Sequence, residues 1–192
     1  MMDKRERIIQ SAIKLFQEKG IDKTTISDIV RNANIAQGTF YIYFPSKLSL
    51  MPAIAEEMVH VLMERIKEKM ETKNTVEQQL QHIIHVIFEV NKQYSEVQAV
   101  VYAGLASSEH IKEWEIVYEP CYQMISQLLE DAQKKGEVTS TISPKRMAKL
   151  LIGLVESAAE QVYLYDHSNE EEAVKQKEAV QQFLLDALRI DK

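Results

Sequence analysis

Polar and aromatic residues crowd together in one short stretch, IAQGTFYIYFPSKLSL, which begins at residue 35. Its candidates for chemistry are Gln37, Thr39, Tyr41, Tyr43 and Lys47. Glutamine is one of two side chains that can bond adenine N6 and N7 in bidentate fashion, while hydroxyl and ammonium groups bind phosphate oxygens. These residue types therefore fit contacts with the bases and the backbone of duplex DNA.

The apolar residues of the same stretch have a different role. Phe40 and Phe44 are four residues apart, so on a helix they share one face, and we expect them to pack into a small core. Gly38 has no side chain and lets the backbone come close to a DNA surface. The simpler alternative, that all the aromatics only fill a core, is accepted for Phe40 and Phe44 but not for Tyr41 and Tyr43.

Three short helices are expected to position these side chains. Apolar residues at helical spacing predict a first helix that ends at Gly20. The sequence TISD, which begins at Thr25, fits a capping box and predicts a second helix. The third helix covers 37–44 and is ended by Pro45. Two short helices that meet across a turn of this length predict a helix-turn-helix.

Charge divides the chain in the same way. Residues 1–50 carry eight basic and five acidic side chains, a surplus of three positive charges. The whole chain has a net charge of −6, so the remainder carries −9. A basic head on an acidic body is typical of a DNA-reading module joined to a different domain.

The remainder of the chain also has helical periodicity. Helices are expected over 46–70, 76–94, 97–107, 111–135, 143–165 and 170–190. No strand pattern and no internal repeat is found, so we predict an all-α protein of about nine helices. We place the boundary between a helix-turn-helix domain, 1–47, and a ligand-binding and dimerisation domain, 48–192.

The sequences TTISDIV, from residue 24, and IAQGTFYIYFPSK, from residue 35, resemble the DNA-binding domain of TetR/AcrR-family transcriptional regulators. The resemblance implies an all-helical homodimer that binds a palindromic operator, most often as a repressor released by a small-molecule inducer. The DNA-binding residues that it implies are Thr24, Thr25, Ala36, Gln37, Gly38, Thr39, Tyr41, Tyr43 and Lys47. Thr24 or Thr25 would bind phosphate, Gln37 and Thr39 would face bases, and Tyr41, Tyr43 and Lys47 would hold the DNA backbone.

The stretch departs from the family pattern at two places. Tyr43 stands where many members have histidine, and Leu48-Ser49 replaces a commonly acidic pair. A tyrosine hydroxyl can still donate to phosphate. The operator sequence, however, cannot be transferred from relatives.

Aromatic residues in the C-terminal part suggest a small-molecule pocket. In WEIVYEPCY, from residue 114, Trp114, Tyr118 and Cys121 or Tyr122 lie on one helical stripe, and Pro120 is expected to bend the helix. The ligand-binding candidates are His85, Phe88, Tyr102, Trp114, Tyr118, Tyr122 and Glu156. The alternative is that this stripe belongs to an ordinary core. The acidic side chains would suit a lipophilic cation, whereas a long apolar pocket would suit an acyl chain.

Enzymatic and metal-binding functions find little support in the sequence. His82, His85 and Glu89 share a helical face but form an incomplete metal set, and a single Glu-x-x-His is too few for a di-iron bundle. No nucleophile–base pair or phosphate loop is present, so we expect no cofactor, no metal and no enzyme activity. An all-helical metal-binding or enzymatic bundle, an activator and a ligand-independent regulator remain the alternatives.

The partners expected are operator DNA, an inducer and a second copy of the chain. Wide apolar faces on the last two helices predict that the homodimer forms there, or alternatively that they only close the monomer core. The apolar run LLIGLVESAAEQV is interrupted by Glu156 and Glu160, so no membrane span is expected. A start without a signal-peptide pattern and a single Cys121 lead us to expect a cytoplasmic protein without disulfides.

Overall fold

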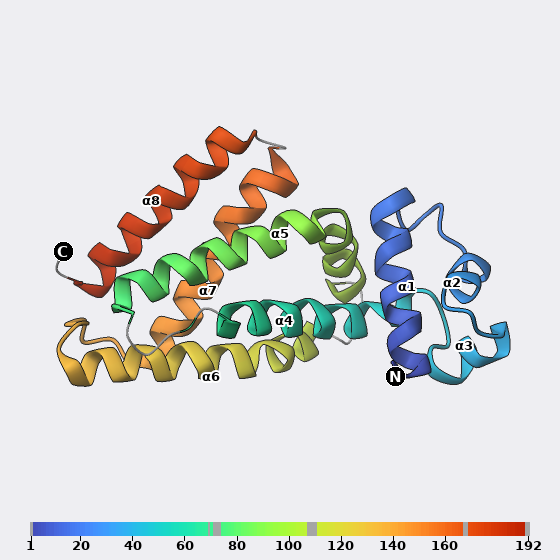
Figure 1. Ribbon diagram of the computed structural model, residues 1–192, viewed down its shortest axis with the longest axis horizontal. Coiled ribbons are helices and arrows are strands. Elements are labelled where there is room, and N and C mark those ends of the chain that lie inside the picture. Colours follow the sequence, from blue (N-terminus) through green and yellow to red (C-terminus); the bar gives the residue numbers. More distant parts are fainter. Residues whose placement is uncertain (1, 69, 71–73, 107–110, 167–168, 191–192) are drawn as a thin grey trace. The chain divides into compact units, whose positions relative to one another are not determined.

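The computed structural model describes residues 2–68, 70, 74–106, 111–166 and 169–190, without the side chains of 100–106 and 111–115 (Figure 1). The regular secondary structure of this part is helical, and it has no strand, which confirms the predicted all-α class. Its α-helices are α1 (Lys4–Lys19), α2 (Ile26–Asn32), α3 (Gln37–Tyr43), α4 (Met51–Glu68), α5 (Val76–Ala106), α6 (Ile111–Lys135), α7 (Pro144–Glu160) and α8 (Glu170–Leu188). A 3-10 turn, Leu48–Leu50, precedes α4, and a π-helical turn, Gln161–Tyr165, follows α7.

The number of helices differs from the prediction. The segments 76–94 and 97–107 were expected as two helices, but both belong to α5, so the described part has eight α-helices and not nine. Neither glycine nor proline lies between them, and Ser95 alone does not end a helix. The helix expected from residue 46 begins at Met51, because its first turn is the 3-10 turn.

The chain forms two compact units. The first contains Met1–Met58 and Tyr94–Val117, and the second contains Val59–Gln93 and Tyr118–Lys192. The long helices α4, α5 and α6 each contribute to both units. The domain boundary that we expected after residue 47 stays a prediction.

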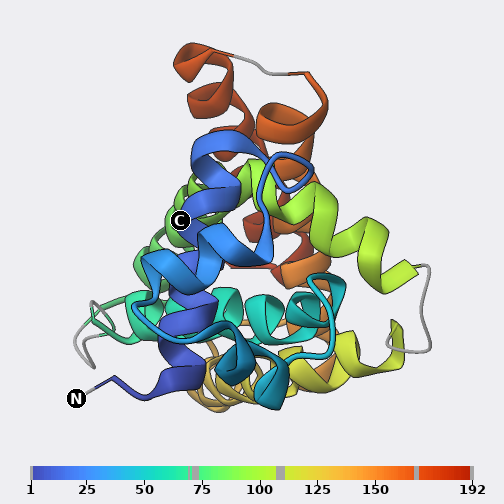
Figure 2. The same ribbon diagram turned by 90° about the vertical axis from the view of Figure 1, so that its right-hand side faces the viewer.

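Helices α1, α2 and α3 pack side by side around a small apolar core in the first unit (Figures 1 and 2). The core includes Phe16 from α1, Ile29 from α2 and Phe40 from α3, all buried. A capping box between Asp3 and Glu6 begins α1. Helices α2 and α3, with seven residues each, are too short to be stable alone and are held by burial against α1 and each other.

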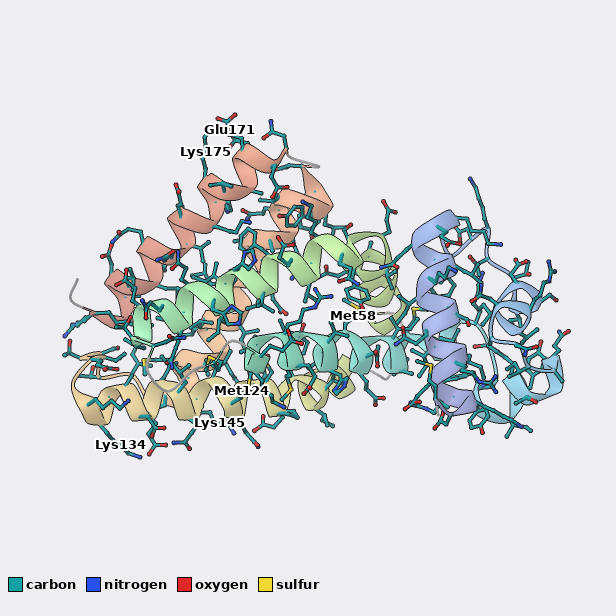
Figure 3. The ribbon with its side chains drawn as sticks, in the orientation of Figure 1. Met58, Met124, Lys134, Lys145, Glu171 and Lys175 are labelled. Atoms are coloured by element: carbon teal, nitrogen blue, oxygen red, sulfur yellow. The ribbon has the colours of Figure 1, made fainter. Side chains whose placement is uncertain are left out.

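In the second unit, α7 and α8 lie against each other (Figure 1). Pro144 occupies the first turn of α7, and the Asn169 side chain accepts a hydrogen bond from the Glu172 N–H to begin α8. Glu171 and Lys175 form an exposed ion pair of 2.9 Å near the start of α8 (Figure 3). None of the described helices combines the length and the apolarity that a membrane crossing requires.

Candidate nucleic-acid interface and ligand-site residues

The turn between α2 and α3 is fixed by its own backbone. The Ala33 N–H donates to the Ile29 carbonyl at 2.9 Å, and the Ile35 N–H donates to the Val30 carbonyl at 3.0 Å. Asn34 adopts a left-handed conformation, φ 52°, which asparagine tolerates better than most residues. The carbonyls at the end of α2 are therefore satisfied within the turn, and the start of α3 is held in a defined direction.

Helix α3 presents two different faces. Phe40 and Phe44 are buried, and their rings contact each other with centroids 5.9 Å apart. Tyr41 and Tyr43 are exposed on the other side. Gln37 and Gly38 are exposed as well, Thr39 is half-buried, and Ala36, the N-cap of α3, is exposed. The predicted division of the stretch into a core face and an outer face is confirmed.

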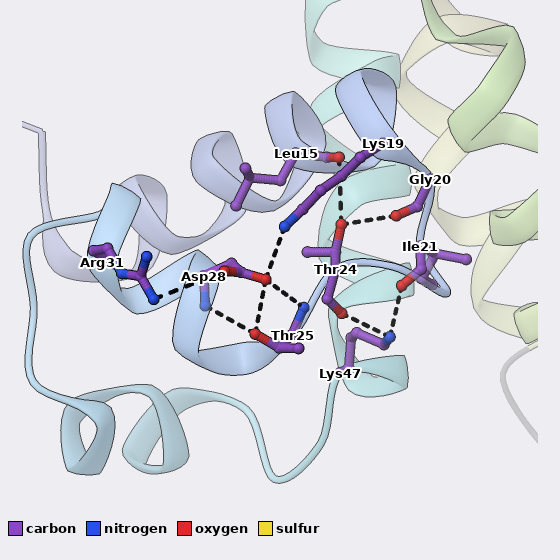
Figure 4. Close-up of polar contacts among 9 residues, drawn as sticks. All are labelled: Leu15, Lys19, Gly20, Ile21, Thr24, Thr25, Asp28, Arg31 and Lys47. Atoms are coloured by element: carbon purple, nitrogen blue, oxygen red, sulfur yellow. Dashed lines mark hydrogen bonds and ion pairs between the residues drawn. The ribbon is translucent and has the colours of Figure 1, made fainter.

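Thr24 differs from the expectation. Its side chain is only 1% exposed, and its hydroxyl lies 2.7 Å from the Gly20 carbonyl oxygen and 3.3 Å from that of Leu15 (Figure 4). The hydroxyl closes the end of α1 and does not reach the surface. The predicted phosphate contact through this side chain is therefore wrong, because burial and internal hydrogen bonding have used the group.

Thr25 is exposed and caps α2 (Figure 4). Its hydroxyl accepts from the Asp28 N–H at 3.1 Å and donates to Asp28 Oδ2 at 2.8 Å. Lys19 Nζ lies 2.8 Å from the same carboxylate. The bond from Lys19, followed by those from Thr25, holds the pKa of Asp28 well below its ordinary value. A phosphate contact by Thr25 stays a prediction and would compete with this network.

Lys47 has a role that the sequence did not indicate. Its Nζ donates to the Ile21 carbonyl at 2.6 Å and to the Thr24 carbonyl at 2.9 Å (Figure 4). The ammonium thus ties the segment after α3 to the loop between α1 and α2. A contact with DNA stays a prediction, and the ammonium has one N–H beyond these two for it.

Ile42 was missed by the sequence reasoning. It is 78% exposed, the largest exposed fraction among the large apolar side chains of the described residues. Ile42 lies four residues after Gly38, so both are on the outer face of α3. An apolar side chain there fits the methyl group of thymine. The sequence could have indicated this exposure, because Ile42 lies two residues from both Phe40 and Phe44 and so does not share their helical face.

The second unit brings three of the predicted ligand-binding residues together. Tyr118 donates to Glu156 Oε1 at 2.5 Å, and its ring lies 5.9 Å from that of Tyr122. Although part of Glu156 reaches the surface, burial of its carboxyl raises its pKa to about 8, and the Tyr118 hydrogen bond offsets part of the rise. Burial likewise raises the pKa of the neighbouring Cys121 thiol to about 12, so this thiol stays protonated at neutral pH.

The other ligand candidates lie elsewhere. Phe88 is buried and packs edge-to-face against Tyr163, with ring centroids 6.3 Å apart. His85 is exposed on a surface groove that His82 and Glu89 also line. Tyr102 and Trp114 have side chains outside the described residues.

No metal site was found in the part of the chain that the structure describes. No three His, Cys, Asp or Glu side chains lie close enough to hold an ion there. His82 Nε2 lies 3.2 Å from the carbonyl oxygens of both Arg65 and Ile66, so this ring has backbone partners.

Two family-wide sequence models match the chain. The one described as bacterial regulatory proteins, tetR family, matches residues 8–54, and the one described as tetracyclin repressor-like, C-terminal domain, matches residues 80–188. YvdT of Bacillus subtilis, an uncharacterized HTH-type transcriptional regulator, is 37% identical over 175 residues, which cover 91% of this chain and 90% of that protein.

Solved structures share the fold. The fatty acid degradation regulator FadR from Bacillus halodurans superimposes with a TM-score of 0.77 at 21% identity and covers 98% of this chain and 97% of its own. Thermus thermophilus FadR, a transcriptional repressor solved in complex with lauroyl-CoA, superimposes with a TM-score of 0.73 at 21% identity. The match covers 98% of this chain and 96% of that protein. At this identity, the two likenesses establish a common fold.

Proposed function

This chain belongs to the TetR family, whose members are DNA-binding transcriptional regulators and not enzymes, and we propose that it acts as a dimeric, inducible repressor. The observation that carries the proposal is the two-faced helix α3. Phe40 and Phe44 fix it to the core, while its outer face presents polar and apolar groups suited to a major groove. The DNA that it regulates would be in the cytoplasm.

Different side chains on the outer face of α3 would contact the bases and the phosphates of the operator. Gln37 and Thr39 would reach base edges, and Ile42 would contact a thymine methyl group. Tyr41 and Tyr43 would donate to phosphates on either side. Ala36 and Gly38, which have no bulk, would let the start of the helix approach the groove closely.

Exposed apolar residues on α7 and α8 support a homodimer through these helices. Leu150 is 64% exposed and Phe183 is 63% exposed, and the small residues Gly153 and Ser157 continue the Leu150 stripe along α7. Small residues allow close approach of helices, and large apolar residues gain most from burial between subunits. Two copies joined here would carry two α3 helices to the half-sites of a palindrome.

An inducer would act by differential affinity. It must bind the conformation released from DNA more tightly than the operator-bound one, and the coupling is limited to that difference. The contact between Tyr118 and Glu156 is one polar site that a ligand could reorganise. Because Thermus thermophilus FadR binds lauroyl-CoA, lauroyl-CoA is the first compound to test.

The test of DNA reading is a binding selection from random duplex DNA. We expect it to return an inverted repeat, and we expect Gln37→Ala to lose discrimination at one base pair per half-site, worth about 1–3 kcal/mol. Gln81→Ala, which changes an exposed glutamine of α5, is the matched control and should leave binding unchanged. Recovery of no inverted repeat would contradict a dimeric operator complex.

The test of the dimer is sedimentation of Leu150→Glu and Phe183→Glu. Both should dissociate the dimer and weaken operator binding, because each places a charge in an apolar contact. Ile142→Glu changes an exposed apolar residue outside α7 and α8 and should remain dimeric. Dimeric behaviour of both interface variants would show that the chain associates elsewhere.

A further inference from the structure

We propose that Asn91 and Tyr163 are polar anchors of the inducer site, and that the inducer carries a neutral group which both donates and accepts hydrogen bonds. A primary amide and a hydroxyl are the two chemical classes that fit. The inference rests on the proposed function, because it names the ligand chemistry of the inducible regulator. It is carried by two buried polar atoms that lack partners among the described residues.

Asn91 contributes an oxygen. The residue lies in α5 and is 6% exposed, and its Nδ2 donates to the Ile87 carbonyl at 2.9 Å. That bond identifies which end of the amide is nitrogen, because an oxygen placed there would face another oxygen. Oδ1 is therefore the free end, and it is buried without a donor.

Tyr163 contributes a hydroxyl. It lies in the π-helical turn Gln161–Tyr165, where the Asp166 N–H reaches back to the Gln161 carbonyl at 3.0 Å. The Tyr163 oxygen is buried and has no partner among the described residues. Burial raises the pKa of this phenol, so it stays protonated and can donate. Single π-helical turns are rare and occur frequently at functional sites.

Phe88 links the two groups. Its ring packs edge-to-face against Tyr163 at 6.3 Å, and Asn91 follows it in α5 by three residues, which is close to one helical turn. Phe88 itself is completely buried. The residues that carry the acceptor and the donor are thus both neighbours of one buried aromatic ring, and an apolar aromatic surrounding with few polar anchors is typical of small-molecule sites.

The energetic argument comes from a comparison with Tyr118. Tyr118 has its partner in Glu156, whereas Tyr163 and Asn91 Oδ1 are without one. A buried polar atom without a partner lowers the stability of the folded state, and native proteins contain few of them. A ligand that supplies both missing partners would recover this loss of stability on binding. The ligand-free protein is therefore less stable than it would be with both atoms paired, and the ligand gains this difference on binding.

The chemistry of the two atoms selects the ligand class. Asn91 Oδ1 can only accept, and the Tyr163 phenol can donate, so a single ligand group that pairs with both atoms needs an N–H or O–H beside an oxygen. A carboxylate accepts from Tyr163 but leaves Asn91 unsatisfied. Lys92, whose Nζ lies 5.9 Å from the Tyr163 ring, is paired with Glu170 at 2.6 Å. Lys177 Nζ lies 5.7 Å from the Phe88 ring, so a carboxylate must be included in the test.

The first arm of the experiment measures thermal unfolding without ligand. Tyr163→Phe removes an atom that has no partner, so its melting temperature should be no lower than that of the full wild-type chain. Asn91→Leu removes the unpartnered Oδ1 but also the Nδ2 bond to the Ile87 carbonyl, so it is used only in the ligand arm, where its response is compared with its own melting temperature without ligand. Tyr118→Phe is the matched control: it removes a satisfied phenol and should lower the melting temperature by about 2–4 °C. If the melting temperature of Tyr163→Phe falls as far as that of Tyr118→Phe, a bound water satisfies the Tyr163 phenol and the proposal is overturned.

The second arm adds octanamide, 1-octanol or octanoate, which share one chain length. We expect octanamide and octanol to raise the wild-type melting temperature, and the rise to be lost in Tyr163→Phe and Asn91→Leu. A rise with octanoate alone would show that Lys177 selects an anion, and it would overturn the neutral class. No rise with any probe, or equal rises in wild type and variants, would overturn the anchors.

A gel-shift assay separates this proposal from the proposed function. Wild type, Tyr163→Phe and Asn91→Leu should all bind the selected operator with the same affinity. If wild type binds no operator, the repressor proposal has failed. If all three bind but the probes do not distinguish them, only the anchor proposal has failed.

Discussion

The N-terminal helices and the helices of the second unit differ in how most of their buried polar groups are used, although Arg7 Nε in α1 is also buried without a partner among the described residues. In α1 to α3, the buried Thr24 hydroxyl has two carbonyl oxygens within hydrogen-bond distance, and Lys47 donates to two carbonyls of the neighbouring loop. In the second unit, Asn91 Oδ1 and Tyr163 OH lack partners, and Glu156 is held with a raised pKa. Because Lys47 fixes the loop between α1 and α2, we expect a rigid reader in the first unit and a responsive site in the second.

The strongest test of this comparison uses two buried phenylalanines. Phe40→Ala and Phe88→Ala each remove a fully buried ring, and each should lower the free energy of unfolding by about 3–5 kcal/mol. Phe40 is the only buried residue within α3, so Phe40→Ala should also abolish operator binding at temperatures where the protein remains folded. Urea unfolding and a gel shift measure the two effects.

Phe88→Ala serves as the control for stability. It should retain operator affinity while it is folded, because it leaves α1 to α3 untouched. Equal losses of operator binding in both variants would show that stability alone determines binding and would remove the distinction between reader and responsive site.

The structure of helices α1 to α3 was more predictable from the sequence than the ligand site. The capping box at Thr25, Pro45 and the spacing of Phe40 and Phe44 are local signals, and each predicted the structure that formed. The role of Lys47 depends on carbonyls up to 26 residues away, whose directions no local pattern specifies. Residue spacing within a helix can identify which side chains share a face, but it cannot identify the distant residues that this face contacts.

The ligand candidates illustrate the same limit. The spacing of Tyr118 and Tyr122 correctly placed both on one helical face, but it did not indicate that Glu156 would accept from Tyr118. Asn91 looked like one more polar residue in a helix. Its importance comes from burial without a partner, which is a property of the packed structure alone.

The second prediction concerns pH and Glu156. The pKa of this carboxyl is raised from 4.5 to about 8, so the folded state holds the proton more tightly than the unfolded state. Its contribution to stability is therefore present below pH 4.5 and is lost as pH rises toward 8, at a cost of roughly a few kcal/mol. Urea unfolding of wild type and Glu156→Gln at pH 5, 6.5 and 8 measures it.

Glu156→Gln keeps an acceptor for Tyr118 and removes the titration. The variant should match wild type at pH 5 and exceed it at pH 8. Parallel pH profiles for the two proteins would mean that the carboxyl is ionised and solvated in the folded state, and Glu156 would then no longer support a responsive site in the second unit.

The third prediction separates two roles for Lys47. If its ammonium mainly ties the loop between α1 and α2, Lys47→Met should lower the free energy of unfolding by about 1–3 kcal/mol, because two carbonyls lose their donor. Operator affinity should fall together with stability. Lys23→Met, in the same loop, changes an exposed lysine and should alter stability by less than about 0.5 kcal/mol.

Salt dependence distinguishes the alternative. A residue that only contacts phosphate would leave stability unchanged and lower the slope of log affinity against log salt by about one. That result for Lys47→Met would support the predicted phosphate contact and would argue against a structural role of Lys47 in the first unit.

The smallest effect compares two helix caps. Thr25 caps α2 and Asn169 caps α8, and in each case the side-chain oxygen accepts from a backbone N–H three residues later. Thr25→Ala and Asn169→Ala should each lower the free energy of unfolding by about 1 kcal/mol. Only Thr25→Ala should also weaken operator binding, because α2 fixes the direction of α3 through the turn. Restoration of binding by Thr25→Ser, which keeps the hydroxyl, would assign the loss to the cap, whereas an equal loss in Asn169→Ala would mean that operator affinity follows overall stability.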